Sequence, residues 1–561
     1  MKNVFPILTF WLFIGLTTSA SAQLINCNPD PNGEPWWAGG LPEITPEIQA
    51  ELDAIPILTL TSQSESVTLP PMVDNSQKVW FRPIFSQYGG SCGQASGVGY
   101  LFTYEINRVR DPQGNQSSNS TNQYPTHFTW NFLNEGNGSG SWYYDGWEII
   151  KESGIPTVET YGGLWKNITG NSKVWETGYE KYYQYLQNKV VDEYHFIDPS
   201  TPLGLDILKH WINDHGVGAG TGGLANFSCY MSGAVYEILT SESAEAGKKI
   251  VRNWGTENGY HAMTIVGYND NVKFDFNDDG QFTNPANNMG AWEIGALKVA
   301  NSMGTSYPGV GQVEPDGFVY MPYRLLANIT GSISPHNVHV LKVNEEYTPE
   351  LTLKTQISFS CRDKLGLKAG YADNTNDINP DGVHSYFAFA NHGGCWGMQG
   401  INTDPIEIGL DYNQFFGNND VAKLFFVVSN TGSVGNGMIH NLSLIDYRWG
   451  EVFELPCSQT DVPIYYNVDT KLSINYHLLP HEAPLATDLN TNDDRVSRFT
   501  TTVPNSKTLR VATNTNIDMY NSEIHIEAGG NLLISGNNTI TARRGTCKLV
   551  IDGNISVGGN V

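Results

Sequence analysis

The sequence predicts an α+β domain followed by an all-β sandwich-like domain and a short, β-solenoid-like C-terminal segment. Three observations predict this order. Residues 76–330 mix helical periodicity with short apolar strands, whereas residues 331–485 alternate apolar and polar positions between loops rich in Gly, Asn and Asp. In residues 486–561, brief apolar segments recur at near-regular intervals with Gly and Asn corners, as in the coils of a solenoid.

Composition and charge argue against a disordered chain and against a nucleic-acid-binding protein. The chain has 561 residues, with 32 Lys and Arg against 57 Asp and Glu, and a formal net charge of −25. Because 40% of the residues are hydrophobic and 12% are aromatic, the chain can bury large cores and is not globally disordered. We also expect no nucleic-acid partner, because phosphates require clustered Lys and Arg.

Residues 1–22 have the pattern of a secretory signal peptide. Lys2 supplies the positive charge, Phe5–Leu16 form the apolar stretch, and Ala20-Ser21-Ala22 is a small-residue cleavage signal. The stretch is too short to cross a bilayer, and no later segment approaches the roughly 18 apolar residues of a spanning helix. We therefore expect a protein secreted to the extracellular space or cell surface, without a transmembrane segment.

The Pro-rich N-terminal segment, residues 23–75, has one predicted helix at Pro46–Ala54, with Thr45 as its cap. In the first domain, Asp145-Gly-Trp-Glu148 is expected to be a capping box that opens a helix ending before Gly154. The remaining elements predicted there are helices at Glu176–Asn188 and Pro202–Asn213, and strands at Met263–Gly267, Ala296–Ala300 and Phe318–Met321.

Short strands are also predicted along the second domain. A sandwich of this kind could bind a surface, a glycan or a substrate, and the sequence selects none of them. The predicted strands are Val338–Val343, Thr355–Ser360, Tyr386–Ala390, Lys423–Val428 and Ile464–Asn467.

The seven cysteines are too few to build the fold. Export allows some pairs, and Cys361, Cys395 and Cys457 share one region of the sequence. The odd number leaves at least one free thiol, unless that thiol pairs between chains.

The strongest local signal is Gln87-Tyr-Gly-Gly-Ser-Cys92. Apolar residues at three- and four-residue spacing follow it and predict a helix that runs to Arg110. A thiol at a helix N-terminus experiences the positive end of the helix dipole, which favours the thiolate. For an isolated Cys a buried structural role is the commoner explanation, so further residues must decide.

A histidine and an asparagine supply the remaining groups of a thiol-based catalyst. His261 begins an apolar segment, and Asn301 follows another, Ala296–Ala300. An imidazole can accept the thiol proton and return it to a leaving amine. An amide oxygen that accepts from the other ring nitrogen fixes the tautomer. Each residue alone is more often structural, but the three together predict nucleophilic catalysis.

In these three motifs, across about residues 76–326, the chain resembles the papain-like (C1) cysteine peptidases. The resemblance implies a papain-like fold and hydrolysis of protein or peptide substrates, with no cofactor required for the chemistry. It assigns Cys92 as the nucleophile, His261 as the general base and acid, and Asn301 as the residue that orients His261. It also places Gln87 and the Cys92 N–H in the oxyanion hole. The family's zymogens usually carry a longer helical propeptide, so residues 23–75 either block the cleft as a short pro-segment or activity is controlled in another way.

Three departures from the family pattern motivate an alternative, in which a catalytically silent papain-like protein serves as a secreted binding or adhesion module. Gln87 stands five residues before Cys92 rather than six, Gly93 replaces an aromatic residue, and Met303 replaces a tryptophan. A third hypothesis is acyl transfer to amines by a transglutaminase-like enzyme. Such enzymes generally orient their His with Asp, so Asn301 counts against it.

A calcium site is predicted between His261 and Asn301. Oxygen ligands at alternate positions followed by Gly280 match the front of a calcium-binding loop. Position 12 is Ala286, so a bidentate ligand must come from elsewhere, such as Glu293. A plain Asx-rich turn is the alternative, and Asp377–Gly382 repeats the pattern more weakly. The expected ligands are Asp275, Asn277, Asp279 and Gln281.

Overall fold

The computed structural model describes the protein from residue 25 to residue 558, with gaps. The predicted signal peptide, residues 1–22, lies outside the described residues. The described ranges are 25–29, 35–38, 40–110, 117–256, 260–305, 316–327, 338–416, 421–448, 452–476, 490–491, 495–497, 501–503, 505–506, 508–511, 516–520, 523–536, 539–544 and 547–558.

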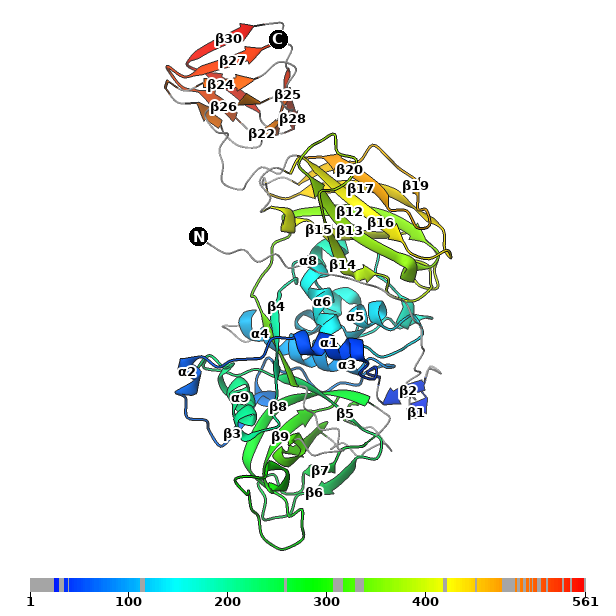
Figure 1. Ribbon diagram of the computed structural model, residues 1–561, viewed down its shortest axis with the longest axis vertical. Helices are drawn as coiled ribbons and strands as arrows, with labels where there is room; N and C mark the ends of the chain where they lie inside the picture. Colours follow the sequence, from blue (N-terminus) through cyan, green and yellow to red (C-terminus); the bar gives the residue numbers. More distant parts are fainter. Residues whose placement is uncertain are drawn as a thin grey trace.

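The first domain is built on a nine-stranded, mostly antiparallel sheet (Figure 1). Its long strand β8 (Tyr260–Lys273) is buried along its first ten residues, because the sheet is covered on both faces there. The predicted strands at 263–267, 296–300 and 318–321 lie within β8, β9 and β10. The sheet order is β4 (Val191–Ile197), β11 (Val338–Val343), β5 (Ala225–Tyr230), β8, β9 (Ile294–Ala300), β10 (Phe318–Pro322), β7 (Lys249–Asn253) and β6 (Val235–Ile238), with β3 (Met72–Asp74) paired to β8.

Strand β11 belongs to the first domain, although the sequence boundary at residue 330 assigns it to the second. It pairs antiparallel with β4 over six residues and touches β5 at His339. Alternation predicts a strand but not the sheet that it joins, which depends on partners distant in sequence. Here the buried His339 ring, bonded to the Tyr143 hydroxyl at 2.6 Å, fits the interior of the first domain.

The helix after Cys92 differs from the single α-helix expected. It opens as α3 (Cys92–Gln94), continues as a π-helix, η2 (Ala95–Phe102), and ends as α4 (Thr103–Arg110). Apolar spacing identifies a helical segment but does not distinguish its α from its π hydrogen-bond pattern. The other α-helices in the described residues are α1 (Pro46–Ala54), α2 (Ser62–Glu65), α5 (Thr126–Leu133), α6 (Tyr143–Ser153), α7 (Val158–Tyr161), α8 (Tyr179–Leu186) and α9 (Pro202–Asp214).

Two predicted helix starts have different outcomes. Thr45 caps α1 as expected, with its hydroxyl accepting the Ile48 N–H at 3.3 Å. The capping box at Asp145 is wrong, because α6 begins at Tyr143 and Asp145 lies inside its first turn. Aromatic packing extends the helix toward its N-terminus: Tyr143 and Trp147, one turn apart, are both buried.

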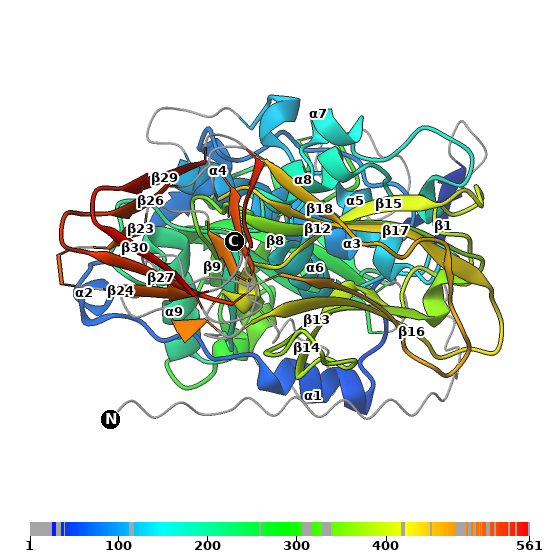
Figure 2. The same ribbon diagram turned by 90° about the horizontal axis from the view of Figure 1, so that it is seen from above.

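The second domain consists of two antiparallel sheets packed face to face (Figure 2). The predicted strand at Ile464–Asn467 is wrong: β19 is Val462–Pro463, and Asn467 adopts a φ of 55° in the turn that follows. One sheet contains β15 (Ile406–Asp411), β12 (Leu351–Phe359), β17 (Gly437–Asp446), β18 (Phe453–Pro456) and β19. The other contains β14 (Gly382–Ala390), β13 (Leu365–Ala372), β16 (Lys423–Asn430) and β20 (Thr470–Asn475).

The two domains share one hydrophobic core. Helices α5, α6 and α8 lie between the first sheet and the sandwich (Figure 1), and buried residues of both domains form one cluster. Phe132 of α5 packs edge-on against Phe389 of β14, with ring centroids 5.4 Å apart. The Tyr179 hydroxyl at the start of α8 bonds the Thr352 hydroxyl of β12 at 2.5 Å.

The C-terminal segment stacks short strands in three parallel ladders. In one ladder Thr508 pairs with Asn531, and Asn531 pairs in turn with Asn554. Recurrent in-register pairing of this kind is the geometry of solenoid coils; the segment's status as an independent unit stays a prediction. The strands are β21 (Asn490–Thr491), β22 (Arg495–Ser497), β23 (Thr501–Val503), β24 (Thr508–Val511), β25 (Asn516–Tyr520), β26 (Glu523–Ile526), β27 (Asn531–Ser535), β28 (Thr539–Arg544), β29 (Lys548–Ile551) and β30 (Asn554–Gly558).

Outside these domains β1 (Ile25–Pro29) and β2 (Pro35–Ala38) form a two-stranded antiparallel sheet. Among the residues that the structure describes, no helix has the length and apolar character needed to cross a membrane.

The Asp145 carboxyl should make stability depend on pH. Burial, with Glu51 and Glu148 nearby, raises the pKa of Asp145 to about 8. Between about pH 4 and pH 8 the unfolded chain loses this proton while the folded chain keeps it, so the contribution to stability falls as pH rises. Asp145→Asn, which cannot ionise, should therefore gain thermal stability over wild type progressively across that range, by a few degrees at pH 8. Melting curves at pH 4, 6 and 8 check this, and a constant difference would contradict it.

Candidate active site

Cys92 lies at the first residue of α3 and is completely buried. The N-cap residue of this helix, Ser91, makes no side-chain cap hydrogen bond. The next residue, Gly93, has no room for a side chain: a Cβ there would lie 2.0 Å from the Ser141 carbonyl oxygen. The missing aromatic residue at this position is therefore explained by the close approach of the loop around Ser141.

His261 and Asn301 come together as the sequence predicts. The His261 Nε2 and Asn301 Oδ1 atoms lie 3.1 Å apart, and both residues are completely buried. Asn301 Oδ1 also accepts the Ser302 N–H at 2.7 Å, which fixes the orientation of the amide. Because an amide oxygen only accepts, Nε2 must carry the ring proton. Nδ1 is left as a lone pair with no partner among the described residues.

Strand pairing brings this His and Asn together. Strands β8 and β9 are antiparallel, with Thr264 opposite Ala300, so Met263 faces the position of Asn301. His261 lies two residues before Met263 and therefore on the same face of β8. Diagonal neighbours across an antiparallel pair are within reach of long side chains, which is the contact observed.

Several backbone N–H groups lie near the Cys92 sulfur. They come from Gly93, from Ala262 beside His261, and from Gly40 and Leu41 of the N-terminal segment. Burial nevertheless raises the pKa of the Cys92 thiol to about 11, and these N–H groups only partly oppose the shift. Burial also lowers the pKa of His261 to about 4. In this structure, then, the Cys92 thiol and the His261 imidazole are both neutral.

Residues Gly40 and Leu41, which we call the strap, cover the thiol. Their N–H groups both donate to the Tyr260 carbonyl, at 2.9 and 3.1 Å. The strap fits between two glycines: a Cβ on Gly140 would lie 0.7 Å from the Gly40 oxygen, and a Cβ on Gly40 would lie 2.5 Å from the Gly90 oxygen. The strap N–H groups are therefore bonded to β8, the Gly40 carbonyl lies against Gly140, and the two residues lie over the buried thiol.

No sequence motif predicted the strap, although Gly40 is the kind of residue that allows two backbone segments to approach closely. Close approach of backbone segments requires residues without side chains. A glycine that precedes a predicted helix in an N-terminal segment does not show which distant glycines it will meet.

Gln87 is buried and bonded to the residue after Asn301. The Ser302 hydroxyl donates to Gln87 Oε1 at 2.6 Å, and the Gln87 N–H donates to the Ser302 carbonyl at 2.6 Å. Gln87 Nε2 donates to the Gly89 carbonyl at 3.0 Å, which leaves its second N–H for an oxyanion. The oxyanion role stays a prediction. Ser302, which the sequence analysis did not select, holds this amide in place.

Met303 is buried at 5% exposure and forms a backbone bridge with Ser86. An apolar side chain is therefore still buried two residues after Asn301, at the position where the family pattern has a tryptophan. Shielding from water strengthens a hydrogen bond such as that between His261 and Asn301.

The predicted calcium loop folds as a tight, exposed turn. The Asp275 carboxylate accepts the N–H groups of Gly280 at 2.7 Å and Asp279 at 3.2 Å. Glu293 is buried, and its carboxylate accepts the N–H groups of Phe276 at 3.1 Å and Thr283 at 3.0 Å. These carboxylates therefore organise the backbone of the loop, and calcium binding stays a prediction.

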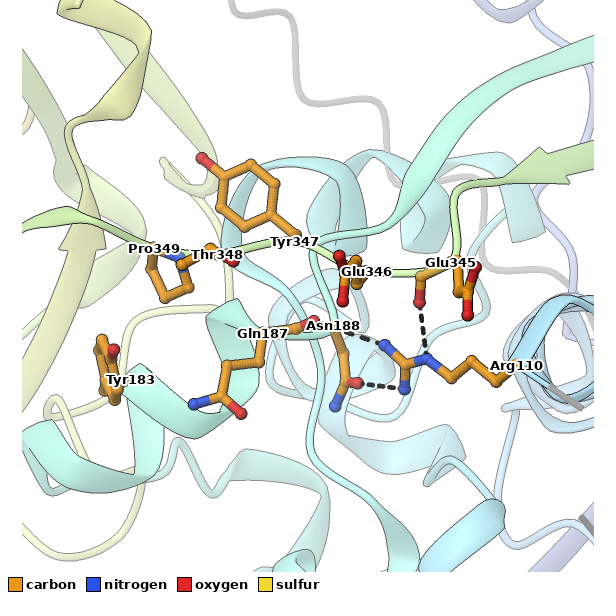
Figure 3. Close-up of a pocket in the computed structure, with 9 residues that line it drawn as sticks. All are labelled: Arg110, Tyr183, Gln187, Asn188, Glu345, Glu346, Tyr347, Thr348 and Pro349. Atoms are coloured by element: carbon orange, nitrogen blue, oxygen red, sulfur yellow. Dashed lines mark hydrogen bonds between the residues drawn. The ribbon is translucent and has the colours of Figure 1, made fainter. Parts of the chain in front are cut away.

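A hollow of about 470 Å³ lies away from Cys92, beside the chain that connects β11 to β12 (Figure 3). The Arg110 guanidinium on its wall donates to the Glu345 carbonyl at 2.8 Å and to Asn188 Oδ1 at 2.8 Å. Because this cation is bonded to the protein itself, it fastens the end of α4 to the connection between the domains.

No family model matches the chain, and no curated protein matches it. Solved structures similar to it include the proform of Amb a 11, a cysteine protease and ragweed pollen allergen, at 16% identity and a TM-score of 0.31 over 53% of this chain and 73% of that chain. Procathepsin B S9 from Trypanosoma congolense has 12% identity and a TM-score of 0.33 over 55% and 86%. The cysteine protease and lectin-like domains of Cwp84, a surface-layer-associated protein of Clostridium difficile, have 9% identity and a TM-score of 0.30 over 76% and 93%.

Displacing the strap should expose the thiol. We expect Gly40→Ala to raise the rate at which iodoacetamide alkylates Cys92 in the full chain at pH 7 by about tenfold or more, because its Cβ has no room beside Gly90 and displacement restores solvent to the sulfur. Mass spectrometry of the Cys92 peptide measures the rate.

Gly220→Ala is the matched control, since a Cβ at Gly220 meets nothing within 4 Å. Equal rates for the two variants would show that the strap does not protect Cys92.

Proposed function

We propose that the protein is a secreted papain-like cysteine peptidase, captured in this structure with its thiol covered. The hydrogen bond from His261 Nε2 to Asn301 carries the proposal, because it leaves a basic Nδ1 in the interior where the Cys92 thiol is buried. A thiol, an imidazole of fixed tautomer and an orienting amide are the groups that acyl transfer to sulfur requires.

The chemistry follows from these atoms. His261 Nδ1 takes the thiol proton, and the Cys92 sulfur attacks the substrate carbonyl carbon. The Cys92 N–H and Gln87 Nε2 stabilise the resulting oxyanion. The intermediate collapses as His261 gives its proton to the departing amine, leaving a thioester. His261 then deprotonates a water molecule, whose oxygen attacks the thioester, and the thiol and a carboxylic acid are released.

Residues 23–75 act as a short pro-segment. The observation that supports this role is the strap, which occupies the Tyr260 carbonyl and shields the sulfur. Because the strap covers the sulfur, a substrate can reach Cys92 only after the strap has moved. Release of the strap also returns water to the site, which lowers the pKa of the thiol and raises that of His261 toward an ion pair.

Secretion is supported by the predicted signal peptide and by one pair of cysteines. Cys361 and Cys395 form a disulfide, as proteins in oxidising compartments commonly do. Cys457 is free. Substrates are proteins or peptides, and binding of a surface or glycan by the β-rich domains stays a prediction.

The alternative, a catalytically silent binding module, is favoured by one observation, the complete burial of Cys92 and His261. Against it, Gly93 and Met303 fit their surroundings, so these departures are accommodated by the fold and do not disrupt the site.

Labelling with an epoxide inhibitor of papain-like enzymes tests the peptidase, in the Gly40→Ala background where the thiol is uncovered. We expect labelling at Cys92 that is absent in Cys92→Ala. His261→Ala should reduce labelling and peptide hydrolysis by about a hundredfold or more, the usual contribution of a general base. Asn301→Ala should reduce them less, because the imidazole remains but its orientation is lost.

Equal labelling with and without His261 would contradict the triad. Labelling without hydrolysis of any member of a peptide library would favour the silent module.

Calcium should stabilise the chain if Asp275, Asn277, Asp279 and Gln281, with Glu293, bind it. Mass action predicts a saturable rise in melting temperature with calcium, by a few degrees at millimolar concentration. Asp275→Asn should abolish the rise, and magnesium serves as the control ion. An unchanged melting temperature would leave the loop as an Asx-rich turn.

A further inference from the structure

A loop of the sandwich domain reaches the first domain. This disulfide loop, residues 392–402, is joined to the end of β12 by the bond between Cys361 and Cys395. Arg362, only 1% exposed, donates from Nε and Nη2 to the Gly393 carbonyl at 3.0 and 2.9 Å. Its own N–H donates to the Trp396 carbonyl at 2.9 Å. The loop is therefore fixed from within by a covalent bond and by a buried guanidinium.

The disulfide loop packs on residues 134–141, which we call the wall loop. The Trp396 indole N–H donates to the Gly136 carbonyl at 2.9 Å. A Cβ on Gly136 would lie 2.4 Å from Trp396 Cδ1, and a Cβ on Gly394 would lie 2.1 Å from the Glu135 carbonyl oxygen. The two backbones thus touch directly, with no space for either to shift toward the other.

The far end of the wall loop touches the residues on both sides of the thiol. A Cβ on Gly90 would lie 2.8 Å from the Gly138 oxygen, and a Cβ on Gly93 would lie 2.0 Å from the Ser141 oxygen. Gly140 lies against the strap carbonyl. A displacement of this loop would therefore move the backbone on both sides of Cys92 and the strap that covers it.

We propose that Trp396 is a positioning residue of the peptidase site: the sandwich domain, through its disulfide loop, holds the wall loop at the distance from Cys92 that a peptide backbone requires. The proposal rests on the proposed function for its consequence on catalysis. Its consequence for the accessibility of Cys92 does not rest on the proposed function, because the wall loop also contacts Gly40 of the strap. The sandwich is then part of the substrate-binding apparatus as well as an attached domain.

The rate of Cys92 alkylation in the full chain tests whether Trp396 holds the wall loop, and it does not depend on catalysis. We expect Trp396→Ala to raise the rate at which iodoacetamide labels Cys92 by about tenfold, through easier opening of the strap. Trp396→Phe, which keeps an aromatic ring but loses the indole N–H, should give a smaller rise. Val434→Ala, at a position of the sandwich that is 60% exposed, should match wild type.

Labelling of Cys457, a partly exposed thiol of the sandwich, controls for unfolding. An unchanged Cys92 rate in Trp396→Ala overturns the proposal, and so does a Cys92 rate that rises in parallel with the Cys457 rate.

Kinetics in the Gly40→Ala background separate positioning from a merely structural role. The substrate is a quenched fluorescent peptide containing Gly and Leu, the two residues that the chain itself places beside Cys92. Trp396→Ala should raise KM by about tenfold while kcat per titrated active site changes by less than about twofold. A fall in kcat with unchanged KM overturns the positioning role.

The double variant Cys361→Ser, Cys395→Ser should raise KM to a similar extent, and adding Trp396→Ala to it should raise KM little further, since both act through one loop. If the increases in KM instead multiply, the disulfide and Trp396 act independently, and the proposal that both act through the disulfide loop is overturned. If the Gly40→Ala chain hydrolyses no peptide, the proposed function fails, whereas the Cys92 labelling rates still decide whether Trp396 holds the wall.

Discussion

The pairing of β8 with β9 is the constraint on which the site depends. Its register places Asn301 diagonally across from His261, and the resulting hydrogen bond fixes which ring nitrogen is basic. A shift by one residue would move His261 to the other face of the sheet and away from Cys92. The helix start at Cys92, the strap and the wall loop are all arranged around a histidine whose orientation this pairing determines.

Burial has two opposite effects at this site. It protects the His261–Asn301 hydrogen bond from water, and it also holds the thiol and the imidazole in their neutral forms. The strap, which keeps water from the thiol, therefore contributes to keeping both groups neutral. In the proposed function, solvent access is accordingly the variable that controls the reactivity of Cys92.

Local patterns in the sequence predicted the local elements well. Thr45 and Pro46 predicted the start of α1, and alternation predicted β12, β14 and β16, because these signals depend on neighbouring residues alone. The meeting of His261 with Asn301 was predicted from motifs. The strap, the contact from Ser302 to Gln87, and the assignment of β11 to the first sheet depend on segments distant in sequence, and no local pattern encodes which glycine or strand they will meet. Asp145 shows the same limit: the capping motif is present in the sequence, but α6 begins two residues earlier, at Tyr143, where the aromatic side chains are buried.

The common core also governs how the protein can be divided for study. Phe132 and Tyr179 of the first domain bury their rings against the sandwich, while β11 completes the first sheet beyond the sequence boundary at residue 330. A fragment of residues 76–330 would lack strand β11 of the first sheet, and it would also expose the aromatic side chains that pack against the sandwich. A fragment that keeps this core intact therefore extends through the sandwich, and recombinant fragments are best ended after β20.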